Sequence, residues 1–183
     1  MNYTADMPTN ELPKRKPTRS HKIDYSREGV YFITICTKDK KHTLSHIVGD
    51  GALDVPRVCL TSIGEVVNAH ILRTAEKMRL TIDRYVIMPN HIHLLLYINE
   101  NGTSRAPSPT SDNFYTNALI PRFVSTFKRF ANKEAGQSLF QRSFHDHVVR
   151  DRHDYRKIAA YIENNPLLWR EDCFFGEGDT ETP

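Results

Sequence analysis

The sequence predicts a single α+β domain in which helices pack on a β-sheet. Residues 31–36 and 91–98 are rich in β-branched, aromatic and aliphatic side chains, as strands are. Residues 62–78 and 120–131 instead repeat apolar side chains at the spacing of amphipathic helices. Because such segments alternate along a chain of 183 residues, we expect one sheet with helices packed on it.

The first half of the chain is predicted to hold strands, a hairpin and a helix. A glycine-containing turn favours a hairpin over residues 46–60. Ser62 and Glu65 fit a capping box at the start of the helix that follows. A mixed polar and apolar strand, 80–88, then precedes residues 91–98, which are nearly all apolar apart from two histidines. Such a run is typical of a central strand covered on both faces.

The second half begins with a loop and ends with a helix. Residues 99–115 contain mostly Gly, Ser, Pro, Asn and Asp, which indicates a flexible loop. The amphipathic segment 120–131 follows, and residues 144–149 form a possible short strand. A last helix is expected over 151–165, because the residue before Pro166 is disfavoured in the helical conformation.

Composition excludes several classes of protein. The hydrophobic share of 39% and the charged share of 26% are those of a globular protein. No stretch approaches the roughly 18 apolar residues of a membrane span, and the N-terminus has no signal-peptide pattern. We therefore expect a cytoplasmic protein with no membrane partner. Cys36, Cys59 and Cys173 are far apart and form no CxxC pair, which favours reduced thiols over a disulfide framework.

Charge divides the chain unevenly. Residues 171–183 carry five carboxylates and no base, so residues 1–170 hold a charge of +8 within the net charge of +3. We expect a flexible basic arm over 1–22, a folded domain over 23–170 and an acidic tail over 171–183. A basic body favours a polyanionic partner, although ordinary solvated charge would give the same composition.

Two histidines interrupt the predicted central strand. Because successive side chains of a strand alternate between faces, His91 and His93 point to the same side. Both imidazoles can then bind one cation, and a third ligand with open coordination positions would make the site catalytic. The alternative is a pair of core histidines with hydrogen-bond partners, and the His-x-His spacing leaves both readings open.

The last helix carries two tyrosines in different settings. Tyr155 lies within the apolar stripe and is expected in the core. Tyr161 lies at the margin of the stripe, and Asn165 shares its face one turn later. A tyrosine in that position is suited to attack a phosphate from a half-exposed cleft. Helix geometry alone favours the simpler alternative, a tyrosine whose ring packs inward and whose hydroxyl meets water.

Two segments carry a family pattern. Residues 85–96 read Tyr-Val-Ile-Met-Pro-Asn-His-Ile-His-Leu-Leu-Leu, a signature of histidine, hydrophobic residue and histidine. Residues 143–151 place an aromatic residue, a histidine, two apolar residues and an arginine before the Tyr-Ile-x-x-Asn-Pro run at 161–166. Together they resemble the single-strand tyrosine transposases of insertion sequences and their REP-associated relatives. The resemblance covers roughly residues 25–170.

The resemblance implies a ferredoxin-like fold with a central antiparallel sheet. It also implies that His91 and His93 bind a divalent metal, Mg²⁺ or Mn²⁺, and that Asn165 completes the metal site. Tyr161 corresponds to the nucleophile, which would form a 5′-phosphotyrosine with single-stranded DNA. His147 matches a motif position before the catalytic helix, with a role either in DNA contact or in support of the site.

The implied partner is single-stranded or hairpin DNA, and a homodimer is a possible assembly. Lys128, Arg129, Arg150 and Lys157 are candidates to line a basic groove for one strand, although each is also compatible with a solvated charge. Two other functions remain open. A metal phosphoesterase that uses water would need the histidines but no tyrosine nucleophile, and a non-catalytic protein would bind hairpin DNA without cutting it.

Overall fold

A computed structural model describes residues 28–49, 55–98 and 119–176 of the chain. Its main sheet has four antiparallel strands in the order β4-β5-β1-β6. These strands are β1 Gly29–Cys36, β4 Thr81–Ile87, β5 His91–Ile98 and β6 His145–Val149. The expected arm at 1–22, the loop at 99–115 and the end of the tail, 177–183, lie outside the described residues.

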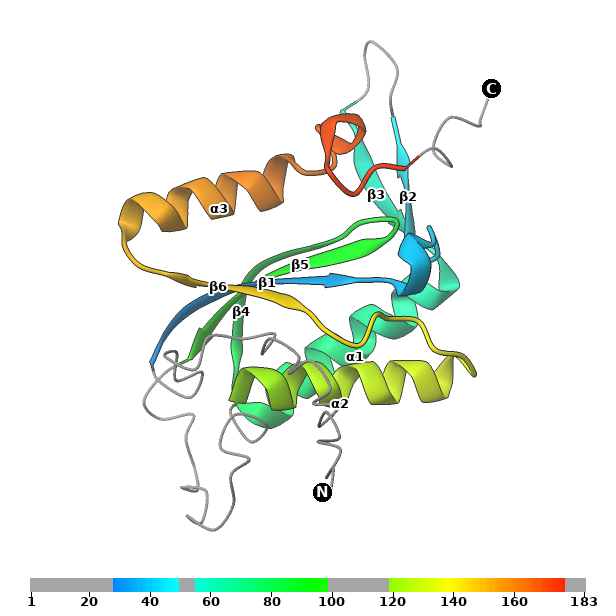
Figure 1. Ribbon diagram of the computed structural model, residues 1–183, viewed down its shortest axis with the longest axis horizontal. Helices are drawn as coiled ribbons and strands as arrows, with labels where there is room; N and C mark the ends of the chain where they lie inside the picture. Colours follow the sequence, from blue (N-terminus) through cyan, green and yellow to red (C-terminus); the bar gives the residue numbers. More distant parts are fainter. Residues whose placement is uncertain (1–27, 50–54, 99–118, 177–183) are drawn as a thin grey trace, which may run out of the picture.

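Within the described residues, three α-helices cover the sheet. Helices α1 Ser62–Met78 and α2 Leu119–Glu134 lie against one face, and α3 Arg152–Asn164 lies against the other (Figure 1). Helix α1 connects β1 with β4, and α2 connects β5 with β6, so that each connection skips one strand. This is the split βαβ arrangement of ferredoxin-like folds. The predicted α+β, ferredoxin-like class is therefore confirmed.

A short second sheet follows the first strand. Strands β2 Ser45–Val48 and β3 Arg57–Leu60 pair in antiparallel fashion, as the hairpin prediction required. Single turns of 3-10 helix lie at η1 Lys38–Lys40 and η3 Trp169–Glu171. In Figure 1 the turn η3 lies beyond the end of α3, on the same side of the main sheet.

Strand β5 divides its side chains between two cores. Ile92, Leu94 and Leu96 are fully buried in the cluster that includes the apolar sides of α1 and α2. Burial of each such side chain stabilises the fold by about 1.5–3 kcal/mol. Leu95 faces a second cluster with Ile162 of α3. The alternation confirms a central strand covered on both faces, and it directs the odd-numbered residues of β5 toward α3.

The start of α1 differs from the prediction by one residue. Thr61, and not Ser62, is the N-cap, because its hydroxyl accepts a hydrogen bond from the Gly64 backbone at 3.0 Å. The same hydroxyl lies 2.7 Å from the Thr43 carbonyl, which ties the helix to the segment before β2. A Cβ at Gly64 would lie 1.9 Å from the Leu44 carbonyl oxygen. The close approach of these two segments therefore requires glycine there.

Candidate active site

The histidine pair lies on the α3 side of the sheet. His91 and His93 are 0% and 1% exposed, and their ring centroids are 4.5 Å apart. The ring of Phe32, from the neighbouring strand β1, stacks on His93 at 5.2 Å. Alternation along β5 thus places both imidazoles on one face, as the His-x-His spacing predicted. Two buried imidazoles this close need partners for their nitrogen atoms.

One nitrogen of each ring is held by a neighbouring side chain. The Nδ1 atom of His91 lies 2.9 Å from Asn90 Oδ1, and that of His93 lies 2.9 Å from Thr34 Oγ1. Because an amide oxygen only accepts hydrogen bonds, His91 carries its proton on Nδ1. Its Nε2 atom therefore presents a lone pair. The Nε2 atoms of both histidines are buried without a hydrogen-bond partner.

Burial keeps both imidazoles neutral. It lowers the pKa of His91 to about 4, although the negative charge of Asp172 opposes the shift. Burial also lowers the pKa of His93 well below its ordinary value, and the neighbouring His91 adds to this effect. Both side chains are consequently uncharged near neutral pH. A neutral imidazole is the form that binds a metal ion.

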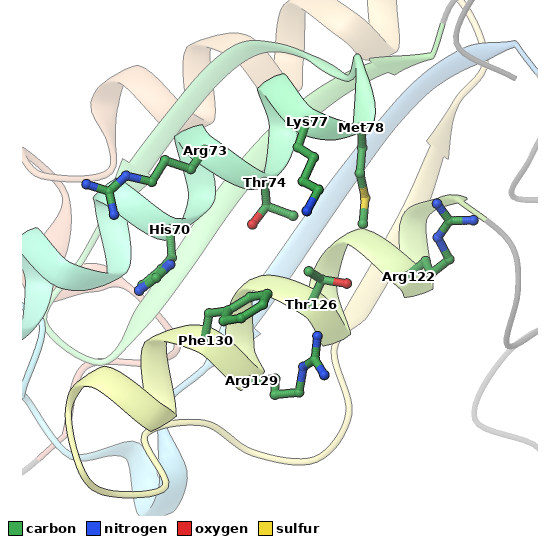
Figure 2. A pocket seen from close by; sticks show the side chains of 9 residues that line it. All are labelled: His70, Arg73, Thr74, Lys77, Met78, Arg122, Thr126, Arg129 and Phe130. Carbon is green, nitrogen blue, oxygen red and sulfur yellow. The ribbon is translucent and has the colours of Figure 1, made fainter. Parts of the chain in front are cut away.

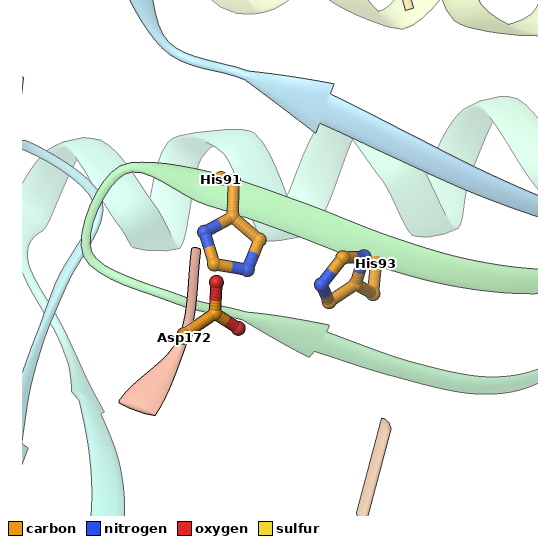
Figure 3. A group of neighbouring side chains, drawn as sticks. All are labelled: His91, His93 and Asp172. Atoms are coloured by element: carbon orange, nitrogen blue, oxygen red, sulfur yellow. The ribbon is translucent and has the colours of Figure 1, made fainter. Parts of the chain in front are cut away.

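The structure adds Asp172 to the pair. Ligand atoms of His91, His93 and Asp172 all lie within 4.8 Å of one another, and the Asp172 carboxylate points at the His91 ring (Figure 3). Asp172 follows η3 and is partly buried. On sequence alone, this residue was expected in the acidic tail over 171–183. Its carboxylate instead supplies an oxygen atom beside two imidazole nitrogens.

Tyr161 projects from α3 toward the same point. Its ring centroid is 5.0 Å from that of His93, and its hydroxyl donates a hydrogen bond to Asp172 Oδ2 at 3.2 Å. The side chain is 39% exposed, as expected for a residue at the margin of the apolar stripe. Burial of the hydroxyl and the Asp172 charge raise the pKa of Tyr161 above its ordinary value. Tyr161 is therefore a neutral phenol near neutral pH.

Asn165 lies one turn beyond Tyr161 and is 2% exposed. Its Nδ2 group donates to Asp172 Oδ2 at 2.7 Å, while its Oδ1 atom is buried without a partner. Buried polar atoms without a hydrogen bond are rare in native proteins. Three such atoms come together here, from His91, His93 and Asn165. Nitrogen and oxygen lone pairs in this arrangement fit a bound divalent cation.

Residues at the start of α3 hold the helix in place. Asp151 caps it by accepting hydrogen bonds from the backbones of His153 and Asp154, at 2.8 and 2.9 Å. Asp154 Oδ2 lies 2.7 Å from His147 Nε2 and accepts a bond from the Arg150 backbone at 3.2 Å. Both contacts lower the pKa of Asp154. His147 thus connects β6 with α3, which favours a supporting role over DNA contact.

Contacts along α3 fix its rotation. The Tyr155 hydroxyl donates to Asp83 Oδ2 at 2.7 Å, and Arg84 pairs with Glu163. Both strand residues belong to β4, so the helix is attached to this edge of the sheet at two points. Tyr155 packs against the second core cluster, as its position in the apolar stripe predicted. The orientation of Tyr161 follows from these anchors.

The segment after α3 closes the site from the other end. The ring of Phe174 lies 4.5 Å from His91, and Trp169 lies 5.8 Å from it. Asn90 donates its Nδ2 group to the Phe174 carbonyl at 2.7 Å. Asp172 Oδ1 accepts a bond from the Phe174 backbone at 2.8 Å. The carboxylate is therefore held by a folded turn and not by a free tail.

The four predicted DNA-binding cations do not share one groove. Lys128 is only 9% exposed, and its Nζ atom donates to the carbonyls of Gln141 and Ser143 at 2.9 and 3.0 Å. Lys128 is therefore part of the packed interior and not a solvated cation on the surface of α2. Arg129 is exposed on α2, across the sheet from the histidines, whereas Arg150 and Lys157 are exposed next to or on α3.

Comparison with known proteins agrees with this geometry. The family model described as "Transposase IS200 like" matches residues 31–165, which include the histidine pair, Tyr161 and Asn165. The chain belongs to the IS200-like transposase family. A protein of Haemophilus influenzae without an assigned function is 30% identical over 177 residues, with 88% of this chain and 93% of that protein covered.

Two further relatives come from the REP-associated branch. A second Haemophilus influenzae protein, whose name assigns it to the REP-associated tyrosine transposases, is 26% identical over 148 residues; the match covers 81% of this chain and 76% of that protein. A REP-associated tyrosine transposase solved with a REP hairpin superposes with a TM-score of 0.54 at 19% identity. That match covers 84% of this transposase and 73% of the solved chain, and it supports the fold.

Sequence reasoning missed Asp172 in this transposase. The five carboxylates of residues 171–183 looked like a solvated tail. The apolar residues that surround Asp172 were the available signal, because Trp169, Phe174 and Phe175 are unusual in a solvated tail. All three pack in or against the second core cluster. Within the described ranges, no helix is long and apolar enough to cross a membrane.

Proposed function

We propose that the protein is a metal-dependent enzyme that nicks and joins single-stranded DNA through Tyr161. The observation that carries the proposal is the hydroxyl of Tyr161 beside three buried ligand atoms without partners, on His91, His93 and Asn165. Membership of a transposase family supports the same chemistry. The proposal includes the expected cytoplasmic location.

The side chains of His91, His93, Asn165 and Asp172 would hold the metal. Two imidazole nitrogens suit later divalent ions, whereas the amide and carboxylate oxygens suit Mg²⁺ and Mn²⁺. We assign Mg²⁺ or Mn²⁺, because Asp172 adds a hard oxygen ligand to the set. When bound, the ion polarises the scissile phosphate and stabilises the negative charge that develops on it.

The residues of the chain supply the nucleophile and accept its proton. The oxygen of Tyr161 bonds to phosphorus as the bond between phosphorus and the 3′-oxygen breaks, which gives a 5′-phosphotyrosine and a free 3′-hydroxyl. Asp172 Oδ2, already hydrogen-bonded to the phenol, takes up the proton that Tyr161 loses. The leaving 3′-oxygen gains a proton from solvent. Attack by another 3′-hydroxyl on the phosphotyrosine reverses these steps and joins two strands.

The proposed substrate is single-stranded DNA next to a hairpin. The similar transposase of known structure was solved with a REP hairpin, and the net charge of this chain outside residues 171–183 is positive. Arg150 and Lys157 are exposed next to or on the helix that carries Tyr161, which suits contact with phosphates on either side of the cleaved bond. The rings of Tyr161 and His93 lie 5.0 Å apart within one copy of the chain, which supports cleavage by a single copy.

Incubation with a labelled hairpin oligonucleotide and Mn²⁺, followed by a denaturing gel, tests the proposal. We expect a covalent band of protein and DNA that disappears with Tyr161→Phe and with EDTA. Tyr85→Phe is the matched control, because it removes a phenol hydroxyl that donates to Asn68 of α1, the helix on the opposite face of the sheet from α3, and we expect it to keep the band.

Two other outcomes would contradict the proposal. Cleavage without a covalent band, retained by Tyr161→Phe, would identify a phosphoesterase that uses water. Binding of the hairpin with neither cleavage nor a covalent band, with or without metal, would identify a non-catalytic DNA-binding protein. Sedimentation in the presence of the hairpin would test the possible homodimer, and a single-copy complex that forms the covalent band would rule out any need for one.

A further inference from the structure

A groove runs between α1 and α2 on their outer side, away from the sheet. It has a volume of about 460 Å³. Figure 2 shows that Thr74 and Lys77 of α1 and Arg129 and Phe130 of α2 point toward the space between the helices. Because α1 and α2 cover the face of the sheet opposite α3, the sheet separates this groove from Tyr161.

Both walls of the groove carry cations. Arg73 and Lys77 come from α1, and Arg122 and Arg129 come from α2. In the part of the chain that the structure describes, these four side chains form no ion pair with a carboxylate. The nearby Glu134 is engaged with His70, at 2.8 Å. Four like charges around one groove repel one another, and an anionic ligand between the walls would relieve that repulsion.

The groove also has an apolar surface. Phe130 is 41% exposed, although it is a large aromatic side chain. The Arg129 guanidinium lies 4.7 Å from its ring centroid, and the His70 ring stacks beside it at 6.0 Å. Met78 lines the groove from the other helix. A ligand that fits this lining combines regularly spaced negative charges with apolar or aromatic groups.

We propose that the groove binds the sugar–phosphate backbone of the nucleic-acid substrate, separately from the site of cleavage. Phosphates would contact Lys77 and Arg129, with sugars or bases against Phe130. The inference rests on the proposed function for the identity of the partner. A second copy of this chain fits poorly, because two such grooves would bring cations against cations. An acidic polypeptide is the competing ligand, and the test below includes one.

The experiment compares two pairs of substitutions that remove equal charge. Lys77→Ala with Arg129→Ala changes the groove, whereas Arg57→Ala with Arg142→Ala removes exposed cations elsewhere. All binding is measured in the Tyr161→Phe background, with a hairpin that has a single-stranded flank, over a range of salt concentrations. Failure of the cleavage chemistry would therefore leave this measurement intact. Circular dichroism checks folding, and Lys77→Gln with Arg129→Gln replaces the alanine pair if its Tm falls.

We expect the groove pair to weaken binding by about tenfold and to reduce the salt slope by about 1.4–1.8, the value for two lost phosphate contacts. The control pair should leave affinity within about twofold. An equal effect of both pairs would overturn the proposal, because it would mean that only net charge matters. A glutamate-rich peptide tests the competing ligand. The proposal would also fail if this peptide bound as tightly as the hairpin and if the groove pair weakened binding of the peptide but not of the hairpin.

Discussion

At the scale of single residues, the candidate site depends on which atoms are left without partners. Asn90 and Thr34 each hold one nitrogen of a histidine, and this leaves the other nitrogen of each ring facing Asp172. Outer contacts of this kind fix the orientation of metal-binding histidines and commonly change metal affinity by about 10–100-fold when they are removed. In the proposed metal site, these contacts would hold the neutral pair in its orientation before a cation binds.

Asp172→Asn should weaken Mn²⁺ binding by at least about tenfold, because it removes the negative charge among the ligand atoms. Isothermal titration calorimetry would measure the change, and Glu171→Gln is the control, since it removes an exposed neighbouring charge. Asp172→Asn should also lower the pKa of Tyr161, because the Asp172 charge helps to raise it. Unchanged metal affinity in Asp172→Asn would remove this residue from the site.

The metal-free protein should lose stability as the pH falls from about 6.5 to about 4. Folded His91 has a pKa of about 4, whereas the unfolded chain takes up a proton near pH 6.5. The contribution of His91 to the free energy of unfolding is therefore fully present above pH 6.5. It falls by on the order of 3 kcal/mol as the pH approaches 4. Urea unfolding at pH 6.5 and at pH 4 would measure this loss. An identical pH dependence in His91→Asn would contradict the assignment.

At the scale of elements, the Thr61 cap of α1 can be tested against the residue that the sequence favoured. Thr61→Ala should lower the free energy of unfolding by about 1–2 kcal/mol, because its hydroxyl bonds both the helix and the segment before β2. Ser62→Ala should change it by less than about 0.5 kcal/mol. Chemical denaturation measures both, and a larger effect at Ser62 would restore the original capping prediction.

Helix α2 places two adjacent cations in opposite roles. Lys128→Ala should destabilise the fold by about 2–3 kcal/mol, because the charged amine bonds two backbone carbonyls. Arg129→Ala should leave stability nearly unchanged and weaken DNA binding. Thermal unfolding and a binding titration on both variants separate the roles. Equal loss of stability would contradict the burial of Lys128.

The elements were predictable because their signals are local. Alternation fixed the face of the histidines, and the break at Pro166 located the end of the last helix near Asn165. Lys128 was misplaced because residues distant in sequence, Gln141 and Ser143, cover it. Thr61 was passed over because its role depends on contacts with Thr43 and Leu44 as well as on its own helix.

At the scale of the whole molecule, the sheet separates the proposed site of cleavage from the proposed site of DNA binding. One face carries Tyr161 and the ligand atoms, and the other carries the cationic groove between α1 and α2. Periodicity predicted the α+β class, and the family resemblance implied roles for His91, His93, Tyr161 and Asn165, which lie close together in the structure. Asp172 required the tertiary structure, because it lies among the carboxylates of 171–183 and only the path of the chain after α3 brings it to the histidines.

The most direct test of the central claim is to map the covalent bond between protein and DNA. Wild-type protein would be incubated with the hairpin substrate and Mn²⁺, digested with protease and nuclease, and its peptides sequenced by mass spectrometry. We expect the nucleotide on Tyr161, in the peptide from α3, and no modified peptide after His93→Ala. A nucleotide on another residue, or cleaved DNA with no modified peptide, would contradict the account of this site.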